Sequence, residues 1–189
     1  MKFIIVASPR TGSTLIAQNL APLCSGEIWL RNRIAGVGWT YDQANKKPVE
    51  YFNKAANGGA KVMTEELTKM TNVPHLFSSV GNIIFLRRRN LTEQSISLLL
   101  ANNFGFQKIE KIETSLELDI NKLKWLSEKW VSLYRKWWKL ASNHANVISF
   151  WYEDINSNPS NIFYEVRKFL NLPVKKCKFK TQFKHYVFD

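Results

Sequence analysis

A short segment near the start of the chain combines hydroxyl-bearing residues with a glycine and an arginine. It occupies positions 8–14 (Ser-Pro-Arg-Thr-Gly-Ser-Thr). This segment follows a short apolar run at 3–7, typical of a buried strand, and leads into a helical pattern at 14–23. The first N–H groups of a helix lack intrahelical partners, and the helix dipole favours negative charge there. We therefore predict that the segment binds a phosphate-like anion.

Each residue type in this segment has its own part in that prediction. Gly12 lets the main chain approach a ligand closely, and Arg10 supplies a planar fork of N–H donors that suits phosphate or sulfate. Hydroxyl donors come from Thr11, Ser13 and Thr14. An ordinary helix N-cap also favours Ser and Thr, but it needs neither the arginine nor the glycine.

A second cationic group stands where the apolar run at 83–86 ends, as Arg87, Arg88 and Arg89. The carboxyl ends of parallel strands form the edge at which open α/β sheets bind ligands. Taken alone, such a triplet is equally well a solvated turn. Whether the triplet indicates a ligand site therefore depends on the elements around it.

Short apolar runs alternate with longer helical patterns, which predicts an α/β fold in three layers, with a mostly parallel central sheet and helices on both faces. The predicted strands occupy 3–7, 60–63, 83–86 and 147–151. The predicted helices occupy 14–23, 92–102, 119–142 and 159–170. The tryptophans of the longest helix have core spacing, although a stacking platform or a partner-binding face stays open. No repeat or linker divides the chain, so we expect one domain, 1–189.

Composition narrows the class of partner. Lys and Arg number 27 against 15 Asp and Glu, a net charge of +12, which implies a nucleic acid, an anionic membrane surface or a phosphate- or sulfate-bearing small molecule. No apolar run approaches the roughly 20 residues of a membrane span. The 2 cysteines and 3 histidines lack ligand-like spacing, so we expect reduced thiols, no metal and a cytoplasmic location.

The loop and the arginine triplet together resemble the sulfotransferases that use 3′-phosphoadenosine 5′-phosphosulfate (PAPS). Residues 8–14 are similar to the family's [ST]-x-P-[KR]-[ST]-G-[ST]-[ST] loop for the 5′-phosphosulfate, with Arg10 at the basic position. Arg89 and Ser97 have the eight-residue spacing of the element that holds the 3′-phosphate. The resemblance implies a P-loop-NTPase-like fold, PAPS as co-substrate and 3′-phosphoadenosine 5′-phosphate (PAP) as product.

Two later segments extend the resemblance to about position 173. Residues 151–155 (Trp-Tyr-Glu-Asp-Ile) resemble the family's Y-E-D-L segment, and residues 158–173 resemble its closing helix. The family transfers an SO₃ unit in line to an acceptor oxygen or nitrogen. The resemblance then implies that Arg10 stabilises the leaving phosphate, that Lys61 assists it as in the K-x-H segment of the cytosolic branch, and that no metal takes part.

The chain departs from that branch at the general base, because Met63 stands where the branch has histidine. Other branches use a glutamate after the first helix, often in a G-E context, and Gly26-Glu27 lies there. We therefore expect Glu27 to be the base, with Glu65 or Glu66 as the alternatives. A partly desolvated carboxylate beside an anionic donor suits that role.

The competing functions are a nucleotide kinase and a basic nucleic-acid-binding module. The loop lacks the lysine of G-x-x-x-x-G-K-[ST], and the nucleic-acid patterns of RNP, zinc-finger and basic-zipper proteins are absent. We expect no nucleic-acid partner and a small-molecule, glycan or peptide acceptor bound by segments 28–57 and 103–118. The aromatic residues of 28–57 suit stacking, but a core or a solvated loop explains them equally well. The sequence predicts no oligomeric state.

Overall fold

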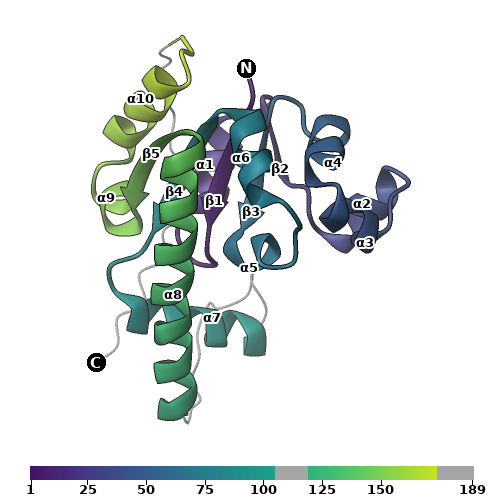
Figure 1. The fold of residues 1–189 in the computed structure, drawn as a ribbon. Coiled ribbons are helices and arrows are strands. Elements are labelled where there is room, and N and C mark those ends of the chain that lie inside the picture. Colours follow the sequence, from purple (N-terminus) through teal and green to yellow (C-terminus); the bar gives the residue numbers. More distant parts are fainter. Residues whose placement is uncertain (105–118, 174–189) are drawn as a thin grey trace.

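The computed structural model describes residues 1–104 and 119–173, and Figure 1 shows their arrangement. The predicted acceptor segment 103–118 lies outside the described residues from position 105 onwards, as does the lysine-rich end of the chain from position 174. Among the described residues, no helix has both the length and the apolar character needed to cross a membrane.

A five-stranded sheet forms the centre of the fold, in the order β2-β3-β1-β4-β5, and every pairing in it is parallel. The strands are β1 (Phe3–Ala7), β2 (Cys24–Glu27), β3 (Gly59–Met63), β4 (Asn82–Arg87) and β5 (Asn146–Trp151). The α/β prediction and its four strands are confirmed. β2 was not predicted, because its sequence CSGE contains no apolar run.

Helices connect the strands and cover the sheet. Around the first three strands they are α1 (Ser13–Asn19), α2 (Arg31–Gly36), α3 (Tyr41–Lys46), α4 (Pro48–Ala55), α5 (Thr64–Leu67) and α6 (Val73–Val80). Beyond β4 they are α7 (Leu91–Phe104), α8 (Ile120–His144), α9 (Tyr152–Ser157) and α10 (Pro159–Phe169). The four predicted helices exist, but α1 ends before the predicted position 23. Pro22 disfavours helical backbone at Ala21, which accounts for part of that difference.

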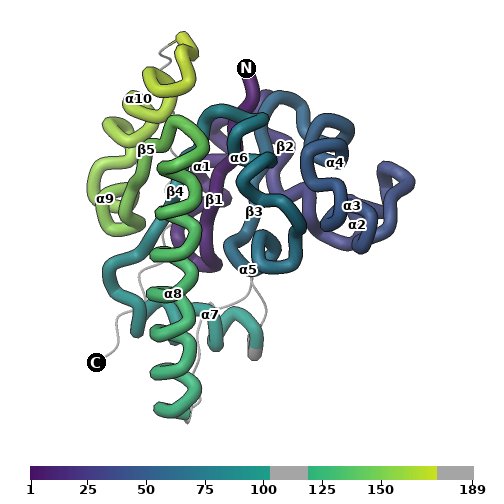
Figure 2. The backbone as a smooth tube through the Cα atoms, in the orientation of Figure 1, coloured from purple at the N-terminus to yellow at the C-terminus, as the bar shows by residue number. Residues whose placement is uncertain are grey.

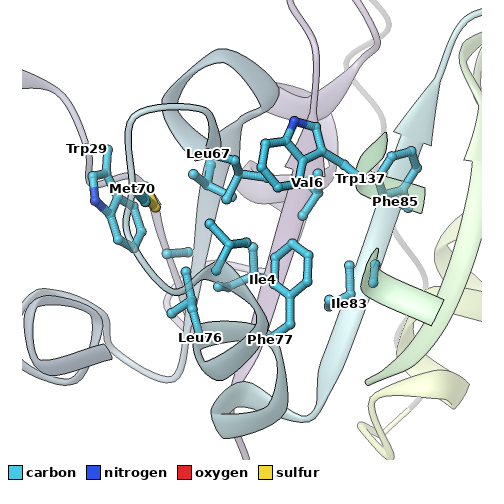
Figure 3. Packing of buried hydrophobic residues seen from close by; sticks show 14 of the residues in the cluster. Ile4, Val6, Trp29, Leu67, Met70, Leu76, Phe77, Ile83, Phe85 and Trp137 are labelled. Atoms are coloured by element: carbon cyan, nitrogen blue, oxygen red, sulfur yellow. The ribbon is translucent and has the colours of Figure 1, made fainter. Parts of the chain in front are cut away.

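The two faces of the sheet carry separate apolar clusters, which confirms the three-layer prediction. Successive side chains of β1 alternate between them: Ile4 and Val6 join the cluster under α6 and α8, whereas Phe3 and Ile5 join the cluster under α1 and α10. Figure 3 shows the first cluster from close by. Every residue of β1 is fully buried, as expected for a central parallel strand covered on both faces.

Helix α8 runs along one face of the sheet, and its N-terminal part extends beyond it (Figures 1 and 2). Trp130 and Trp137 are buried in the core, and Trp138 packs edge-on against Phe85 with 5.6 Å between ring centroids. The core interpretation is therefore confirmed for these residues. Trp125 is different, because 58% of it is exposed.

The predicted acceptor segment 28–57 is largely helical, since it forms α2, α3 and α4. Trp29 is 1% exposed and packs edge-on against Tyr51, so both belong to the core. Tyr41, in contrast, is partly exposed, and the Arg31 guanidinium lies 5.7 Å from its ring centroid. Of the aromatic residues of this segment, Tyr41 is therefore better placed than Trp29 to reach a ligand.

Gly59 gives a test of this packing. It pairs with Phe3 across β1 and β3, and a Cβ atom at position 59 would overlap the Phe3 ring. We expect Gly59→Ala to lower the free energy of unfolding by about 1–3 kcal/mol, because the Phe3 ring must move within a filled core. Gly36→Ala is the matched control, since a Cβ there meets nothing within 4 Å. Urea denaturation measures both, and equal stabilities of the two variants would contradict this account.

Candidate active site

The β1–α1 loop, residues 8–12, leaves the sheet at the carboxyl end of its central strand. Arg10 (φ 64°) and Gly12 (φ 76°) both have left-handed backbone, which glycine adopts readily and arginine rarely does. Gly12 is the N-cap of α1, and no side chain of the described residues caps this helix. The first-turn N–H groups of α1 are therefore not taken by a side-chain oxygen, as an anion site requires.

Buried hydroxyl groups hold the loop in shape. The Thr11 hydroxyl donates to the Ser8 carbonyl at 2.8 Å, and the Ser8 and Thr64 hydroxyls lie 2.7 Å apart. Ser8, Thr11 and Thr64 are all 0% exposed. Ser13 is also buried, whereas Thr14 is exposed. The Thr11 hydroxyl thus has a structural partner, and the prediction that Thr11, Ser13 and Thr14 serve a ligand stays a prediction.

Arg10 and Ser97 come together although 87 positions separate them. The Arg10 Nε donates to the Ser97 Oγ at 2.8 Å, which joins the loop to α7. Sequence reasoning assigned Arg10 to the phosphosulfate end of the donor and Ser97 to the 3′-phosphate end. The structure brings the two predicted elements into direct contact at one edge of the sheet.

Of the arginine triplet, Arg87 and Arg88 are held by their neighbours. Arg87 donates to the Ser149 Oγ at 3.0 Å, and its guanidinium lies over the Trp151 ring, 4.2 Å from the centroid. Burial lowers the pKa of Arg87. Arg88 forms a 2.7 Å ion pair with Glu93, its side chain is only 5% exposed, and it donates to the Arg10 carbonyl at 3.3 Å. Both arginines therefore have structural partners.

Arg89 is the accessible member, with half of its side chain exposed. It forms a two-point contact with Asp154, at 2.8 and 2.9 Å, and its backbone N–H donates to Glu153 at 3.1 Å. The hydrogen bond to Asp154 raises the pKa of Arg89. The Y-E-D-L-like segment thus meets the triplet directly, and an anion at Arg89 would meet Asp154 there.

The predicted base and the predicted second cation form an ion pair. Glu27 ends β2, Lys61 is its partner on β3, and Glu27 Oε2 lies 2.9 Å from Lys61 Nζ. Their side chains are 20% and 12% exposed, so the pair is largely removed from water. Lys61 is level with Ile5, three residues before Ser8, or roughly 10 Å along the strand direction. Lys61 therefore lies on the strand next to β1 and Glu27 one strand farther out, and Lys61 is three residues short of the level at which the β1–α1 loop begins.

The two alternative carboxylates both lie on α5 but have different surroundings. Glu65 accepts a 2.9 Å hydrogen bond from Thr64, whose hydroxyl also contacts Ser8, so Glu65 is linked to the β1–α1 loop. Glu66 accepts a hydrogen bond from the Tyr41 hydroxyl and one at 2.8 Å from Lys69. The hydrogen bond to Glu66 raises the pKa of Lys69. Glu65 is therefore connected to the loop, whereas Glu66 belongs to a cluster with Tyr41.

Two buried polar residues beside the loop were not identified from the sequence. Gln94 on α7 donates to the Pro9 carbonyl at 2.8 Å, and the Tyr134 hydroxyl on α8 donates to Gln94 at 3.0 Å. Tyr134 lies among the apolar residues of a helical seam, a pattern that indicates a core position. A glutamine in a helical pattern carries no sign of a contact 85 positions away.

The described residues contain no group of three or more His, Cys, Asp or Glu side chains placed to hold a metal ion. Cys24 is a buried free thiol, and burial raises its pKa, which disfavours a reactive thiolate.

Two solved structures share the fold of this chain. Mouse sulfotransferase SULT7A1, complexed with PAP, aligns with a TM-score of 0.55 at 13% identity, over 92% of this chain and 60% of that one. The sulfotransferase domain from the curacin biosynthetic pathway aligns with a TM-score of 0.52 at 14% identity, over 92% of this chain and 75% of that one. The chain thus spans about 60% of the length of the mouse protein. The P-loop-NTPase-like fold is confirmed.

No curated protein sequence matches the chain. The family described as "Sulfotransferase domain", however, matches residues 1–189. That match spans the β1–α1 loop, Arg89, Ser97 and the Glu27–Lys61 pair. The chain belongs to the sulfotransferase domain family.

Proposed function

We propose that this protein transfers a sulfuryl group from PAPS to a hydroxyl or amine group of a small-molecule, glycan or peptide acceptor. The observation that carries the proposal is the 2.8 Å contact between Arg10 and Ser97. It joins a loop of the kind that grips a phosphosulfate to a helix of the kind that holds a 3′-phosphate. Family membership supports the proposal, as does the PAP complex of a protein with the same fold.

The donor would bind along the carboxyl edge of the sheet. Its phosphosulfate would accept hydrogen bonds from the N–H groups at the start of α1 and from the Arg10 guanidinium. Arg10 uses its Nε toward Ser97, and its terminal amino groups are further donors for the phosphosulfate oxygens. Arg89 and Ser97 would hold the 3′-phosphate. Cationic groups of the protein at both ends of the site would favour this donor over ATP, which lacks a 3′-phosphate.

In the transfer step, the acceptor oxygen attacks sulfur as the bond from sulfur to the phosphate oxygen breaks. The electron pair of that bond leaves with PAP, so negative charge grows on the 5′-phosphate. The loop N–H groups and Arg10 stabilise this charge, and the protein holds donor and acceptor in line. The acceptor proton passes to a general base. Lys61 would assist the leaving group once it is released from Glu27. No metal ion enters the step.

Glu27 is our first choice for the base because its position matches the family's glutamate and it is largely removed from water. Glu65 is the structural competitor, because Thr64 links it to the β1–α1 loop. Glu27 ends β2, whereas Glu65 lies on α5 in the connection after β3. Substituting each one separately therefore distinguishes them.

The donor class is tested by binding. We expect isothermal titration calorimetry to show tight binding of PAP and much weaker binding of ATP–Mg²⁺ or a mixed oligonucleotide, because only PAP carries phosphates at both the 3′ and the 5′ position. Comparable affinity for ATP–Mg²⁺ would favour a kinase and contradict the proposal. Preference for the oligonucleotide would favour a nucleic-acid-binding module.

Arg89 is tested with the same titration. We expect Arg89→Ala to weaken PAP binding by about tenfold or more, because hydrogen bonds to charged groups are lost. Affinity for adenosine 5′-phosphosulfate, which has no 3′-phosphate, should stay unchanged. The substitution also leaves Asp154 without its arginine, so Arg89→Ala combined with Asp154→Asn removes that added repulsion. Arg135→Ala, at an exposed position of α8, is the control. Equal losses for both nucleotides would place the 3′-phosphate elsewhere.

The base is tested by turnover. After a screen with radiolabelled donor identifies an acceptor, Glu27→Gln should lower kcat by about 100-fold or more and leave PAP affinity intact, since general-base catalysis contributes on that scale. Glu65→Gln and Glu66→Gln are made in parallel, and Glu50→Gln, at an exposed position of α4, is the control. If Glu65→Gln alone removes turnover, the base is Glu65 and the assignment of Glu27 is wrong.

A further inference from the structure

A buried chain of polar side chains reaches the β1–α1 loop from the two longest helices. Gln94 is 0% exposed and Tyr134 is 8% exposed. The Tyr134 hydroxyl donates to Gln94 Oε1 at 3.0 Å, and Gln94 Nε2 donates to the Pro9 carbonyl at 2.8 Å. The Gln94 amide therefore connects α8 to the main chain of the loop, and the Tyr134 hydroxyl also interacts with the Ser8 side chain and the Arg88 backbone.

The hydrogen bonds between these polar side chains run in one direction, from Tyr134 to Gln94 to Pro9. The two ends of an amide are chemically different, so an O–H donor at Oε1 turns Nε2 toward the Pro9 carbonyl. Burial raises the pKa of Tyr134 to about 12, so its hydroxyl keeps its proton and remains a donor near neutral pH. The Tyr134–Gln94 contact is buried and the Gln94–Pro9 contact is partly buried, so losing either leaves a shielded polar group without its partner, which is costly.

The loop needs such support. Arg10 follows Pro9 directly and has a φ of 64°, in the left-handed region that costs about 1–2 kcal/mol for a residue with a side chain. Two hydrogen bonds hold the backbone at this point, from Gln94 to the Pro9 carbonyl and from Arg88 to the Arg10 carbonyl. The backbone conformation of Arg10 sets where its guanidinium points.

A neighbouring contact joins the same helices without reaching the loop. Trp130 Nε1 on α8 donates to the Ser95 Oγ on α7 at 3.2 Å. Ser95 is 0% exposed, like Gln94 beside it, and its own hydroxyl donates to the Leu91 carbonyl within α7. Ser95 thus resembles Gln94 in burial and in its contact with α8, but its hydroxyl donates within α7, whereas the Gln94 amide donates to Pro9.

We propose that Gln94 and Tyr134 are positioning residues, which set the Pro9–Arg10 backbone and thereby aim Arg10 and the loop N–H groups at the donor phosphosulfate. The identity of the ligand rests on the proposed function. The hydrogen bonds that position the loop are present whatever ligand the loop binds. Helix α8, far from the loop in sequence, then contributes to donor affinity through these hydrogen bonds.

The test compares Gln94→Met, Tyr134→Phe and Ser95→Ala in the full chain. Amide hydrogen exchange, followed by mass spectrometry on peptides covering residues 7–15, reports the loop without any ligand. Titration with PAP measures donor affinity, which depends on the orientation of the loop. We expect Gln94→Met to speed exchange in these peptides and to weaken PAP binding, each by about tenfold, which corresponds to about 1.4 kcal/mol. Tyr134→Phe should act in the same direction but less strongly. Ser95→Ala should lower thermal stability and change neither loop readout.

A double variant separates positioning from general packing. If Tyr134 acts mainly through Gln94, adding Tyr134→Phe to Gln94→Met should weaken PAP binding by less than the effect of Tyr134→Phe alone, whereas fully independent effects would add and would contradict the link through Gln94. The interaction of Tyr134 with Ser8 accounts for any smaller remaining loss. The proposal is wrong if Gln94→Met leaves loop exchange at the wild-type rate. It is also wrong if faster exchange leaves PAP affinity unchanged, or if Ser95→Ala changes exchange equally. Wild-type protein that does not bind PAP would overturn the proposed function, while the exchange comparison would still decide whether Gln94 holds the loop.

Discussion

The site depends on how a fully buried strand ends in a polar loop. Water is excluded around β1, so the polar groups that follow it must find partners in the protein. Those partners come from two other connections of the sheet: Thr64 follows β3, and Arg88 and Gln94 both follow β4. The need to satisfy one loop therefore brings together segments that are far apart in sequence, and the proposed donor site lies where they meet.

Three cations of the site are already paired with carboxylates, whereas Arg10 contacts the neutral Ser97 hydroxyl. Arg88 faces Glu93, Arg89 faces Asp154 and Lys61 faces Glu27. The net charge of +12 is thus no measure of free positive charge at the sheet edge. An anionic ligand would be recognised there by the placement of N–H donors and by exchange with these carboxylates. Long-range attraction from the whole chain would raise its rate of arrival more than its affinity.

The sequence predicts an element where one short segment contains the whole pattern for it. Apolar runs marked β1, β3, β4 and β5, and hydroxyls around Gly12 marked the loop. β2 was missed because Cys24 is its one apolar residue, although β2 carries the predicted base, Glu27. The contacts of Arg10 with Ser97 and of Gln94 with Pro9 join positions 87 and 85 apart. No local pattern encodes such contacts, because they exist only after the sheet and helices have assembled.

The central place of β1 also determines when the site can form. The first strand of the chain pairs with β3 on one side and β4 on the other, both made later, and its loop further requires Tyr134 on α8. During synthesis, the apolar segment 3–7 therefore stays without both strand partners until β4 has been made, and its loop waits longer for Tyr134. Folding that depends on such distant pairings is slow, and the exposed strand invites aggregation. Early shielding of residues 3–7 by a chaperone would therefore favour the yield of folded protein.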